Sequence, residues 1–386
     1  MPLLLLMLAS GAAFASGPEL AFREHVIATD LRGGYQVVAV DMNRDGKPDL
    51  LALASGMPEL VWFENPTWRR HVIAGGFNRM INLATRDLDG DGIPEIVLAH
   101  DFANEAKNSI GTVSVLQHRG DPTKPWSVQE IDRLTTSHRL RWADIDGSGK
   151  PVVVNAPLTG AAAAAPEYRD KAPLVFYRPG EWKRETIGAG DEGVVHGIYI
   201  YDWDGDGRED VLTASFVGVH LHQLGKDGRW RRTRIVEGDP SPWPKSGSSD
   251  IAIGMLGRER FLASIEPWHG NQVVIYRRQG RAWKRQVIDD SIADGHTILA
   301  TDLDGDGRDE VVVGFRQGRR SVYVYSSDGA KGWSRHTLDD GGISAAACAV
   351  ADLNGDGRPD VACIGAATTN LKWYENLTPQ AKRGRR

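Results

Sequence analysis

The fold of this chain is decided by one recurring stretch, Asp302-Leu-Asp304-Gly-Asp306-Gly307-Arg-Asp-Glu310, which is followed at once by the apolar run Val311-Val-Val-Gly. Five further copies of the pattern begin at Asp41, Asp87, Asp144, Asp202 and Asp352. An internal repeat of roughly 50 residues is typical of solenoids, propellers and arrays. The periodicity therefore predicts one repetitive body, whereas the length of 386 residues alone would suggest two or three domains.

Each repeat has the pattern of four short strands. An apolar run leads into the first Asp, a second follows the loop, a third is aromatic, and a fourth begins near a Trp that we expect to serve packing. One fourth strand, Phe22 to Ile27, stands alone at the front, and the last repeat stops after its third strand. The free edges of an open array disappear if the N-terminal strand completes the last blade. With 251–257 as a degenerate first strand, the sequence predicts an all-β, seven-bladed propeller of four-stranded antiparallel blades over 18–376, and a basic tail over 377–386.

The loops place oxygen-bearing side chains at positions 1, 3, 5 and 9 and glycine at position 6. This pattern suits a hard cation such as calcium, although Asx and Gly residues also make turns that hold no metal. An EF-hand would need Glu at position 12, where the first copy has Ala52. We predict structural Ca²⁺ in five loops and none in the third, which has Ser148 and Val152. The predicted ligands are Asp41, Asn43, Asp45, Asp49, Asp87, Asp89, Asp91, Glu95, Asp202, Asp204, Asp206, Asp210, Asp302, Asp304, Asp306, Glu310, Asp352, Asn354, Asp356 and Asp360.

A second group of residues emerges six positions before each leading Asp. These positions hold Tyr35, Ile81, His138, His196, Ser249, His296 and Ala346, so three of the 11 histidines share one register. Near the corresponding strand ends lie His100, Asp101, Arg139, Glu266 and His269. Because the aspartate loops join first to second strands, this group should converge at the opposite mouth of the central channel. There His138, His196, Glu266, His269 and His296 would suit one Zn²⁺, Mn²⁺ or Mg²⁺, unless each histidine only links neighbouring blades by hydrogen bonds.

Composition and the ends of the chain narrow the function classes. A net charge of -5 gives no basic surface for nucleic acid. The chain has only two cysteines, Cys348 and Cys363, which are too few for a thiolate zinc site. They flank the last aspartate loop, where either a disulfide or two buried thiols would fit, and we favour the thiols. The apolar stretch 1–15 predicts a signal peptide and export to the periplasm or the exterior. No other stretch has the ~18 apolar residues that a membrane span needs.

The aspartate loops resemble FG-GAP or VCBS-type repeats, in which such loops bind calcium at the blade hairpins. The segments 30–36, 138–139, 196–197, 266–271 and 294–297 resemble the propeller of the aldos-2-ulose dehydratases. That family eliminates water from keto sugars, and its propeller holds a metal with the dehydration site. The resemblance implies a metal that polarises the ketone, a histidine that removes the adjacent C–H proton, and Arg139 or Tyr35 steadying the enolate. That family also carries cupin domains, which we do not find in these residues, so the resemblance does not extend to an isomerase step linked to them.

The sequence therefore predicts an exported, metal-dependent carbon–oxygen lyase that acts on a keto sugar or an oxidised glycoside. Metal ligation and proton transfer would be divided among His138, His196, Glu266, His269 and His296. The alternative from another class is a calcium-dependent, non-catalytic module that binds a glycan or a protein. A hydrolase is disfavoured, because neither a Ser-His-Asp order nor a glycosidase pair of carboxylates stands out.

Overall fold

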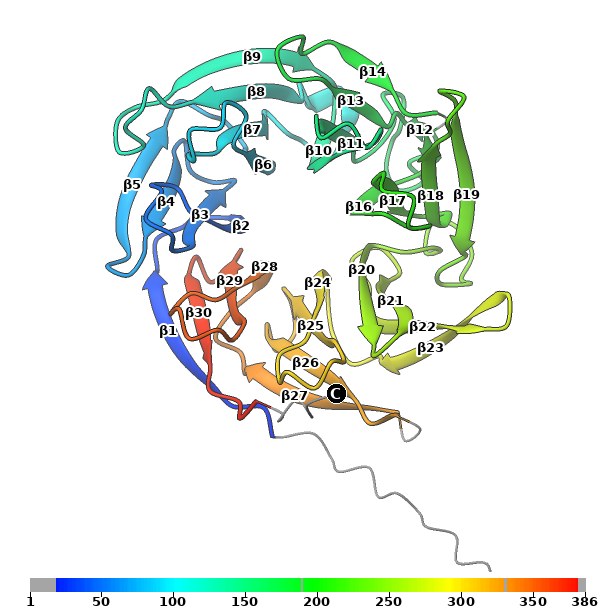
Figure 1. Ribbon diagram of the computed structural model, residues 1–386. Helices are drawn as coiled ribbons and strands as arrows, with labels where there is room; N and C mark the ends of the chain where they lie inside the picture. Colours follow the sequence, from blue (N-terminus) through cyan, green and yellow to red (C-terminus); the bar gives the residue numbers. More distant parts are fainter. Residues whose placement is uncertain (1–18, 189, 330–331, 381–386) are drawn as a thin grey trace, which may run out of the picture.

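The computed structural model describes residues 19–188, 190–329 and 332–380, so the predicted signal peptide lies outside them. Seven four-stranded antiparallel sheets stand around one axis like the blades of a propeller (Figure 1). The predicted seven-bladed all-β fold is therefore confirmed. Within the described residues no helix is both long and apolar enough to cross a membrane.

Each blade runs from an inner strand beside the axis to an outer strand. Blades 1 to 3 are formed by β2 (Gly34–Val40), β3 (Asp49–Ala54), β4 (Leu60–Glu64) and β5 (Arg69–Ala74); β6 (Asn82–Arg86), β7 (Glu95–His100), β8 (Thr112–Gln117) and β9 (Ser127–Arg133); and β10 (Ser137–Ala143), β11 (Val152–Pro157), β13 (Val175–Tyr177) and β14 (Arg184–Thr186). Blades 4 and 5 are formed by β16 (Val195–Tyr201), β17 (Asp210–Ser215), β18 (Gly218–Leu224) and β19 (Trp230–Val236); and β20 (Asp250–Leu256), β21 (Glu259–Glu266), β22 (Gln272–Gln279) and β23 (Ala282–Asp289). Blade 6 has β24 (Gly295–Thr301), β25 (Glu310–Phe315), β26 (Val322–Ser327) and β27 (Trp333–Asp339), and blade 7 has β28 (Ala345–Ala351), β29 (Asp360–Gly365), β30 (Leu371–Asn376) and β1 (Phe22–Ala28). A short extra pair, β12 (Lys171–Ala172) with β15 (Asp191–Glu192), and the 3-10 turn η1 (Ala106–Asn108) lie in the connections.

The ring is closed by the N-terminal strand, as the sequence predicts. Strand β1 pairs antiparallel with β30, from Phe22 opposite Asn376 to Ala28 opposite Leu371. The His25 ring also stacks on Trp373, with centroids 4.3 Å apart. Because the two ends of the chain share blade 7, this blade has the same four strands as the others and the outer edge of β30 is paired.

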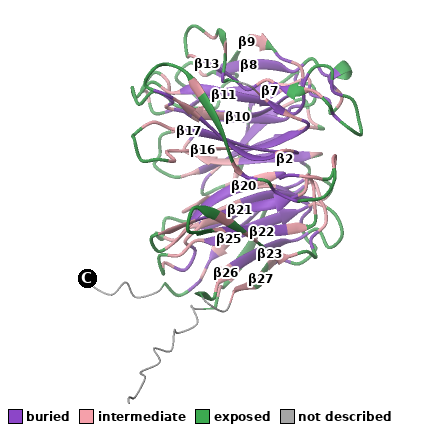
Figure 2. Cartoon of the chain, turned by 90° about the vertical axis from the view of Figure 1, so that its right-hand side faces the viewer, coloured by how far each residue is buried: buried purple, intermediate pink, exposed green. Residues whose placement is uncertain are grey.

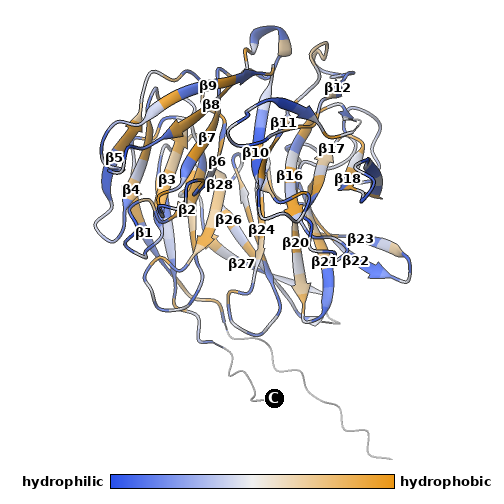
Figure 3. Ribbon diagram, turned by 45° about the horizontal axis from the view of Figure 1, so that its top comes forward, coloured by the Kyte–Doolittle hydropathy of each residue, from blue (hydrophilic) through white to orange (hydrophobic). Residues whose placement is uncertain are grey.

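Burial follows the position of a strand within its blade. Every residue of the second strands β3, β11, β17, β25 and β29 is buried, because neighbouring blades cover both faces. Outer strands such as β9 are mostly exposed. Figure 2 shows the buried residues running through the stacked blades and the exposed residues at the turns, and Figure 3 shows the matching division between apolar strands and hydrophilic loops. The core is thus a stack of blade faces around the axis.

The two cysteines correct one expectation. Cys348 on β28 and Cys363 on β29 stand directly opposite each other in the ladder and form a disulfide. The favoured alternative of two free thiols is therefore wrong. The reason is the register, because directly paired cross-strand residues bring their side chains within bonding reach.

Candidate functional site

A β-bulge occurs at one equivalent position in five blades. In each of these blades the pairing between the first and the second strand skips one residue. The five skipped residues are Tyr35, His138, His196, His296 and Ala346. A bulged residue leaves the ladder, and its side chain is aimed differently from its neighbours. In the other two blades the first strand begins at the residue after the register position, at Asn82 and Asp250, and its pairing has no such skip. The bulge is thus the local feature that turns the register residues toward the axis.

Four imidazoles meet where the bulges lie. The His196 ring is central, with its centroid 5.1 Å from that of His138, 4.8 Å from that of His269 and 4.9 Å from that of His296. Tyr35 of blade 1 joins them, because its hydroxyl is 2.9 Å from Nε2 of His138 in blade 3. Contacts between blades that are not neighbours in the ring require these side chains to lie on the axis.

Three of these histidines form a compact group of nitrogen atoms. His196, His269 and His296 each offer one ring nitrogen, and the three atoms lie within 4.8 Å of one another. The Nε2 atoms of His196 and His269 are 3.2 Å apart. Two imidazole nitrogens on one tetrahedral ion, each at 2.0–2.1 Å, would be about 3.3 Å apart. The observed spacing is compatible with that geometry and also with a hydrogen bond between the two rings.

Burial keeps these imidazoles neutral. It holds the pKa of His138, His196 and His296 well below the usual range, and nearby arginines add to the effect. Burial, with the Arg316 charge, lowers the pKa of His269 to about 3. At pH 7 every ring therefore has one nitrogen with a free lone pair.

The hydrogen bonds at His296 identify which nitrogen it can offer. Nδ1 lies 2.6 Å from the carbonyl oxygen of Ala346, which can only accept, so Nδ1 carries the proton. Nε2 keeps the lone pair and is buried without a partner among the described residues. An orphaned buried acceptor is costly, so this lone pair is available to a bound ion or a water molecule.

His269 is held by a charged pair outside the group. Its Nδ1 lies 3.2 Å from Oδ1 of Asp294 and 3.1 Å from Nη2 of Arg316, and Arg316 is itself paired with Asp294 at 2.9 Å. A carboxylate behind a histidine is the usual way in which a metal-ligating ring is oriented. The backbone of His269 has a φ of +49°, a strained value for a residue with a Cβ. The turn thus holds this ring against its neighbours at a conformational cost.

Tyr35 and Arg139 lie beside the four imidazoles, whereas the predicted site residues His100, Asp101 and Glu266 do not. Arg139 donates from Nε to the carbonyl oxygen of His196 at 2.9 Å, and its guanidinium is 5.7 Å from the centre of the Tyr35 ring. His100 instead binds Asp101 and Ser114, away from the four imidazoles.

Glu266 is placed differently from the expectation. Its buried carboxylate accepts from the Tyr276 hydroxyl at 2.7 Å and from Nε of Arg285 at 2.8 Å, both within blade 5. Glu266 is the last residue of β21 and still paired with Gln272, so its side chain points along the blade face rather than toward the axis. Of the Glu-Pro-Trp-His stretch, His269 alone joins the imidazoles.

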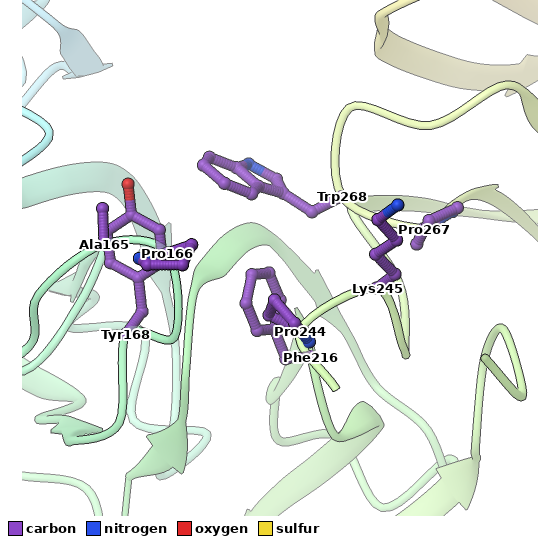
Figure 4. Close-up of a pocket in the computed structure, with 8 residues that line it drawn as sticks. All are labelled: Ala165, Pro166, Tyr168, Phe216, Pro244, Lys245, Pro267 and Trp268. Atoms are coloured by element: carbon purple, nitrogen blue, oxygen red, sulfur yellow. The ribbon is translucent and has the colours of Figure 1, made fainter. Parts of the chain in front are cut away.

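A cavity of about 330 Å³ is lined by Trp268, the neighbour of His269 in the sequence (Figure 4). Trp268 links the two, because its ring centre lies 4.8 Å from that of His269 and 5.7 Å from those of Tyr168 and Phe216. The lining consists of Ala165, Pro166, Tyr168, Phe216, Pro244, Lys245, Pro267 and Trp268. Sequence analysis did not find this cavity, because Tyr168 and Lys245 lie on inserts that share no register with the repeats.

Five of the six aspartate loops at the other end, all but the one that begins at Asp144, share one hydrogen-bond pattern. The leading Asp accepts from the backbone N–H of position 6, as in Gly46 to Asp41 at 2.8 Å, and the position 9 carboxylate accepts from position 2, as in Leu303 to Glu310 at 2.8 Å. Burial raises the pKa of Asp49 and Asp210 to about 6 and that of Glu310 to about 8. Three loops hold carboxylate oxygens within 4.8 Å of one another, in the sets Asp87, Asp89, Glu95; Asp202, Asp204, Asp206; and Asp302, Asp304, Asp306. Such crowded, partly buried oxygens are suited to a hard cation.

Comparison with known proteins confirms the resemblance. A model of the FG-GAP-like repeat matches residues 41–98 and 302–363, and a model of the aldos-2-ulose dehydratase β-propeller domain matches 110–279. The aldos-2-ulose dehydratase of Phanerodontia chrysosporium is 25% identical over 260 residues, which cover 59% of this chain and 28% of that protein. The rhamnogalacturonan endolyase YesW of Bacillus subtilis is 22% identical over 258 residues, which cover 59% of this chain and 36% of that protein. The chain thus corresponds to about a third or less of each curated relative.

A solved structure shares the fold. The exotype rhamnogalacturonan lyase YesX superposes with a TM-score of 0.51 and 14% identity, over 94% of this chain and 75% of that one. At this identity the likeness shows the architecture alone.

Proposed function

We propose that this chain is an exported, metal-dependent carbon–oxygen lyase that acts on a keto sugar or an oxidised glycoside. The observation that carries the proposal is the group of neutral imidazoles of His196, His269 and His296, with two Nε2 atoms 3.2 Å apart. The names of the two curated relatives, a sugar dehydratase and a rhamnogalacturonan endolyase, support carbohydrate chemistry of the elimination type. The apolar stretch 1–15 supports export.

The donor set favours a borderline divalent ion. Imidazole nitrogens suit Zn²⁺ better than Mn²⁺ or Mg²⁺, which prefer oxygen ligands. His196, His269 and His296 would hold the ion, and Asp294 would orient His269. Such an ion would polarise the ketone of a bound sugar and acidify the adjacent C–H bond.

Proton transfer is assigned to His138 with Tyr35. His138 is neutral and stands outside the three-imidazole group, and its Nδ1 has no partner in the described part of the chain. It can accept the carbon-bound proton and return it to the departing oxygen, while the Tyr35 hydroxyl at 2.9 Å fixes the orientation of the ring. Arg139 and Arg316 place positive charge beside the negative charge that develops on the sugar oxygen.

Calcium has a separate, structural place in the proposal. We assign Ca²⁺ to the aspartate loops at the other end of the ring, where the ion would neutralise carboxylates that the fold forces together. Because such sites exist only in the folded chain, their binding energy would add to its stability.

A non-catalytic, calcium-stabilised module that binds glycans is the competing function. The aromatic cavity beside Trp268 would serve it. Binding alone, however, gives no reason for three neutral imidazoles with nitrogens at a metal-ligand spacing. We therefore favour the lyase.

Metal analysis combined with activity tests the proposal. Purified protein should retain one transition-metal ion per chain after mild chelation and should convert a keto sugar to an enone, followed by its ultraviolet absorbance. The double variant His196→Ala/His296→Ala should lose both the ion and the activity. His336→Ala, on the outer strand β27, is the matched control and should retain both. Calcium as the sole metal, with no change in the double variant, would sink the lyase and leave the binding module.

A further inference from the structure

We propose that the substrate is a glycoside with an aromatic or apolar aglycone, and that the cavity beside His269 holds this aglycone as the leaving group. The inference rests on the proposed function and refines it, because the expelled group is then an alcohol rather than water. We call the cavity formed by Tyr168, Phe216 and Trp268, with the surrounding prolines, the aglycone cavity.

The chemical character of the lining favours an apolar occupant. Three aromatic rings and three prolines surround the space, and of the eight lining residues Lys245 alone carries a charge. Sugar hydroxyls placed against these surfaces would lose hydrogen bonds to water without replacement. An aromatic or apolar ring would instead gain from burial and from edge and face contacts with the three side chains.

The size and rigidity of the cavity suit one ring. A volume of about 330 Å³ is at the lower end of the range for small-molecule sites. Phe216 is backed by Trp243, whose ring centre is 5.2 Å away. Trp243 is itself fixed by a 2.8 Å hydrogen bond to the carbonyl oxygen of Glu167 and by the Arg169 guanidinium 4.0 Å from its ring centre. The cavity is therefore preformed, which lowers the entropy cost of binding.

Continuity with the imidazoles orients the substrate. Trp268 lines the cavity (Figure 4). It also lies against His269, whose Nε2 is 3.2 Å from that of His196. A sugar bound over the imidazoles would thus point one substituent past His269 into the aglycone cavity. Loss of water would need no such space, because a hydroxyl has no ring to accommodate.

The reaction balances without a co-reactant. In a glycoside oxidised at C3, the C2–H bond breaks and its proton passes to His138. The electron pair forms the C1–C2 double bond, the C1–O bond breaks, and the departing oxygen takes up the proton to leave as an alcohol. The products are an unsaturated keto sugar and the aglycone, with no net oxidation and no water consumed.

The test compares 4-nitrophenyl and methyl 3-ketoglucosides as substrates of the metal-loaded protein. The wild type should have the higher kcat/KM for the aryl substrate. Trp268→Ala should lower this aryl-to-methyl ratio roughly 3- to 10-fold, mainly through KM, and Trp268→Phe should restore part of it. Trp283→Ala, which removes a half-buried tryptophan on the outer strand β23, should leave the ratio unchanged.

The outcomes separate the two proposals. Equal turnover of the two glycosides by the wild type, or an equal loss for both in Trp268→Ala, overturns the aglycone cavity and leaves the elimination reaction standing. If neither keto glycoside reacts, the proposed function fails, and calorimetry with unoxidised 4-nitrophenyl glucoside decides the cavity alone. Binding that weakens in Trp268→Ala but not in Trp283→Ala then supports it, and binding that is absent or equal in all variants refutes it.

Discussion

Replacing Glu310 with glutamine should have opposite effects on stability in calcium and in chelator. The Glu310 side chain is buried at position 9 of its loop, where Oε2 accepts from the Leu303 N–H at 2.8 Å. The carboxylates of Asp302, Asp304 and Asp306 crowd the same loop. Glutamine keeps the size and an accepting oxygen but removes the charge, so the substitution isolates the electrostatic contribution.

The magnitude follows from the pKa. Burial raises the pKa of Glu310 from 4.5 to about 8, so without calcium the side chain is protonated in the folded chain at pH 7 and ionised in the unfolded one. This difference lowers the free energy of unfolding at pH 7 by about 3 kcal/mol relative to a group with no shift. The stabilising contribution of the protonated side chain is full below pH 4.5 and is lost as the pH rises through 8. Glu310→Gln should therefore be more stable than the wild type in chelator at pH 7, by up to about 3 kcal/mol.

Calcium should reverse the order. An ion at 1,000 times its dissociation constant stabilises the folded state by about 4 kcal/mol, and loss of a charged ligand forfeits much of this gain. Urea unfolding followed by circular dichroism, in chelator and in calcium, measures both effects. The control is Glu259→Gln, which removes a surface carboxylate paired with Arg277 at 2.7 Å and should behave alike in the two conditions. A Glu310→Gln protein that is less stable than the wild type in both conditions would refute the argument.

Two further predictions concern stability away from the loops. Burial lowers the pKa of His222 to about 4. Between pH 6.5 and 4 this histidine is therefore protonated in the unfolded chain and neutral in the folded chain. The free energy of unfolding should fall by up to about 3 kcal/mol on acidification through this range. His222→Gln should reduce this fall in urea titrations at pH 7 and pH 4.5, and an identical fall in the two proteins would contradict the assignment. The second prediction concerns the disulfide, whose cysteines are 15 residues apart in the sequence. Loop-closure entropy in the unfolded chain makes such a cross-link stabilise the folded state by about 3 kcal/mol, so Cys348→Ala/Cys363→Ala should unfold at a lower urea concentration. An unchanged midpoint of urea unfolding would show that blade 7 gains no stability from the bond.

The blade count was predictable because its signal is local. An aspartate loop fixes oxygen atoms at set spacings and leads directly into a buried strand, so each copy marks the same hairpin wherever it occurs. Even blade 5, which lacks the loop, was recovered through 251–257, and its first strand is β20. What escaped prediction was the insertion in blade 3, where β13 and β14 shorten and the extra pair of β12 with β15 appears. Such inserts have no counterpart in the other repeats, so the periodicity of the sequence does not predict them.

Glu266 shows where proximity in sequence fails to predict proximity in space. It lies three residues before His269, yet it ends a strand whose pleat directs its side chain into the blade. Tyr276 and Arg285 then satisfy the carboxylate from β22 and β23, which are separate segments of the chain. The orientation of a side chain at a strand end depends on where the ladder stops, and the sequence does not mark that point. The aromatic cavity escaped for a related reason, because Tyr168 and Phe216 meet only through tertiary packing.

The histidines were found because a bulge and a loop are held at a fixed distance. The inner strands β2, β10, β16 and β24 each pair with the second strand of their blade. After the bulge this pairing has no further shift until it reaches the residue at position 9 of the loop, which is a carboxylate in three of these blades and Val152 in blade 3. A one-residue slip anywhere in that stretch would turn every following side chain to the opposite face. The loop therefore sets the register at one end of the strand, and the bulge presents a side chain at the other end. The strand between them therefore positions both the loop of the proposed ion and the side chain of the proposed chemistry, although no residue belongs to both.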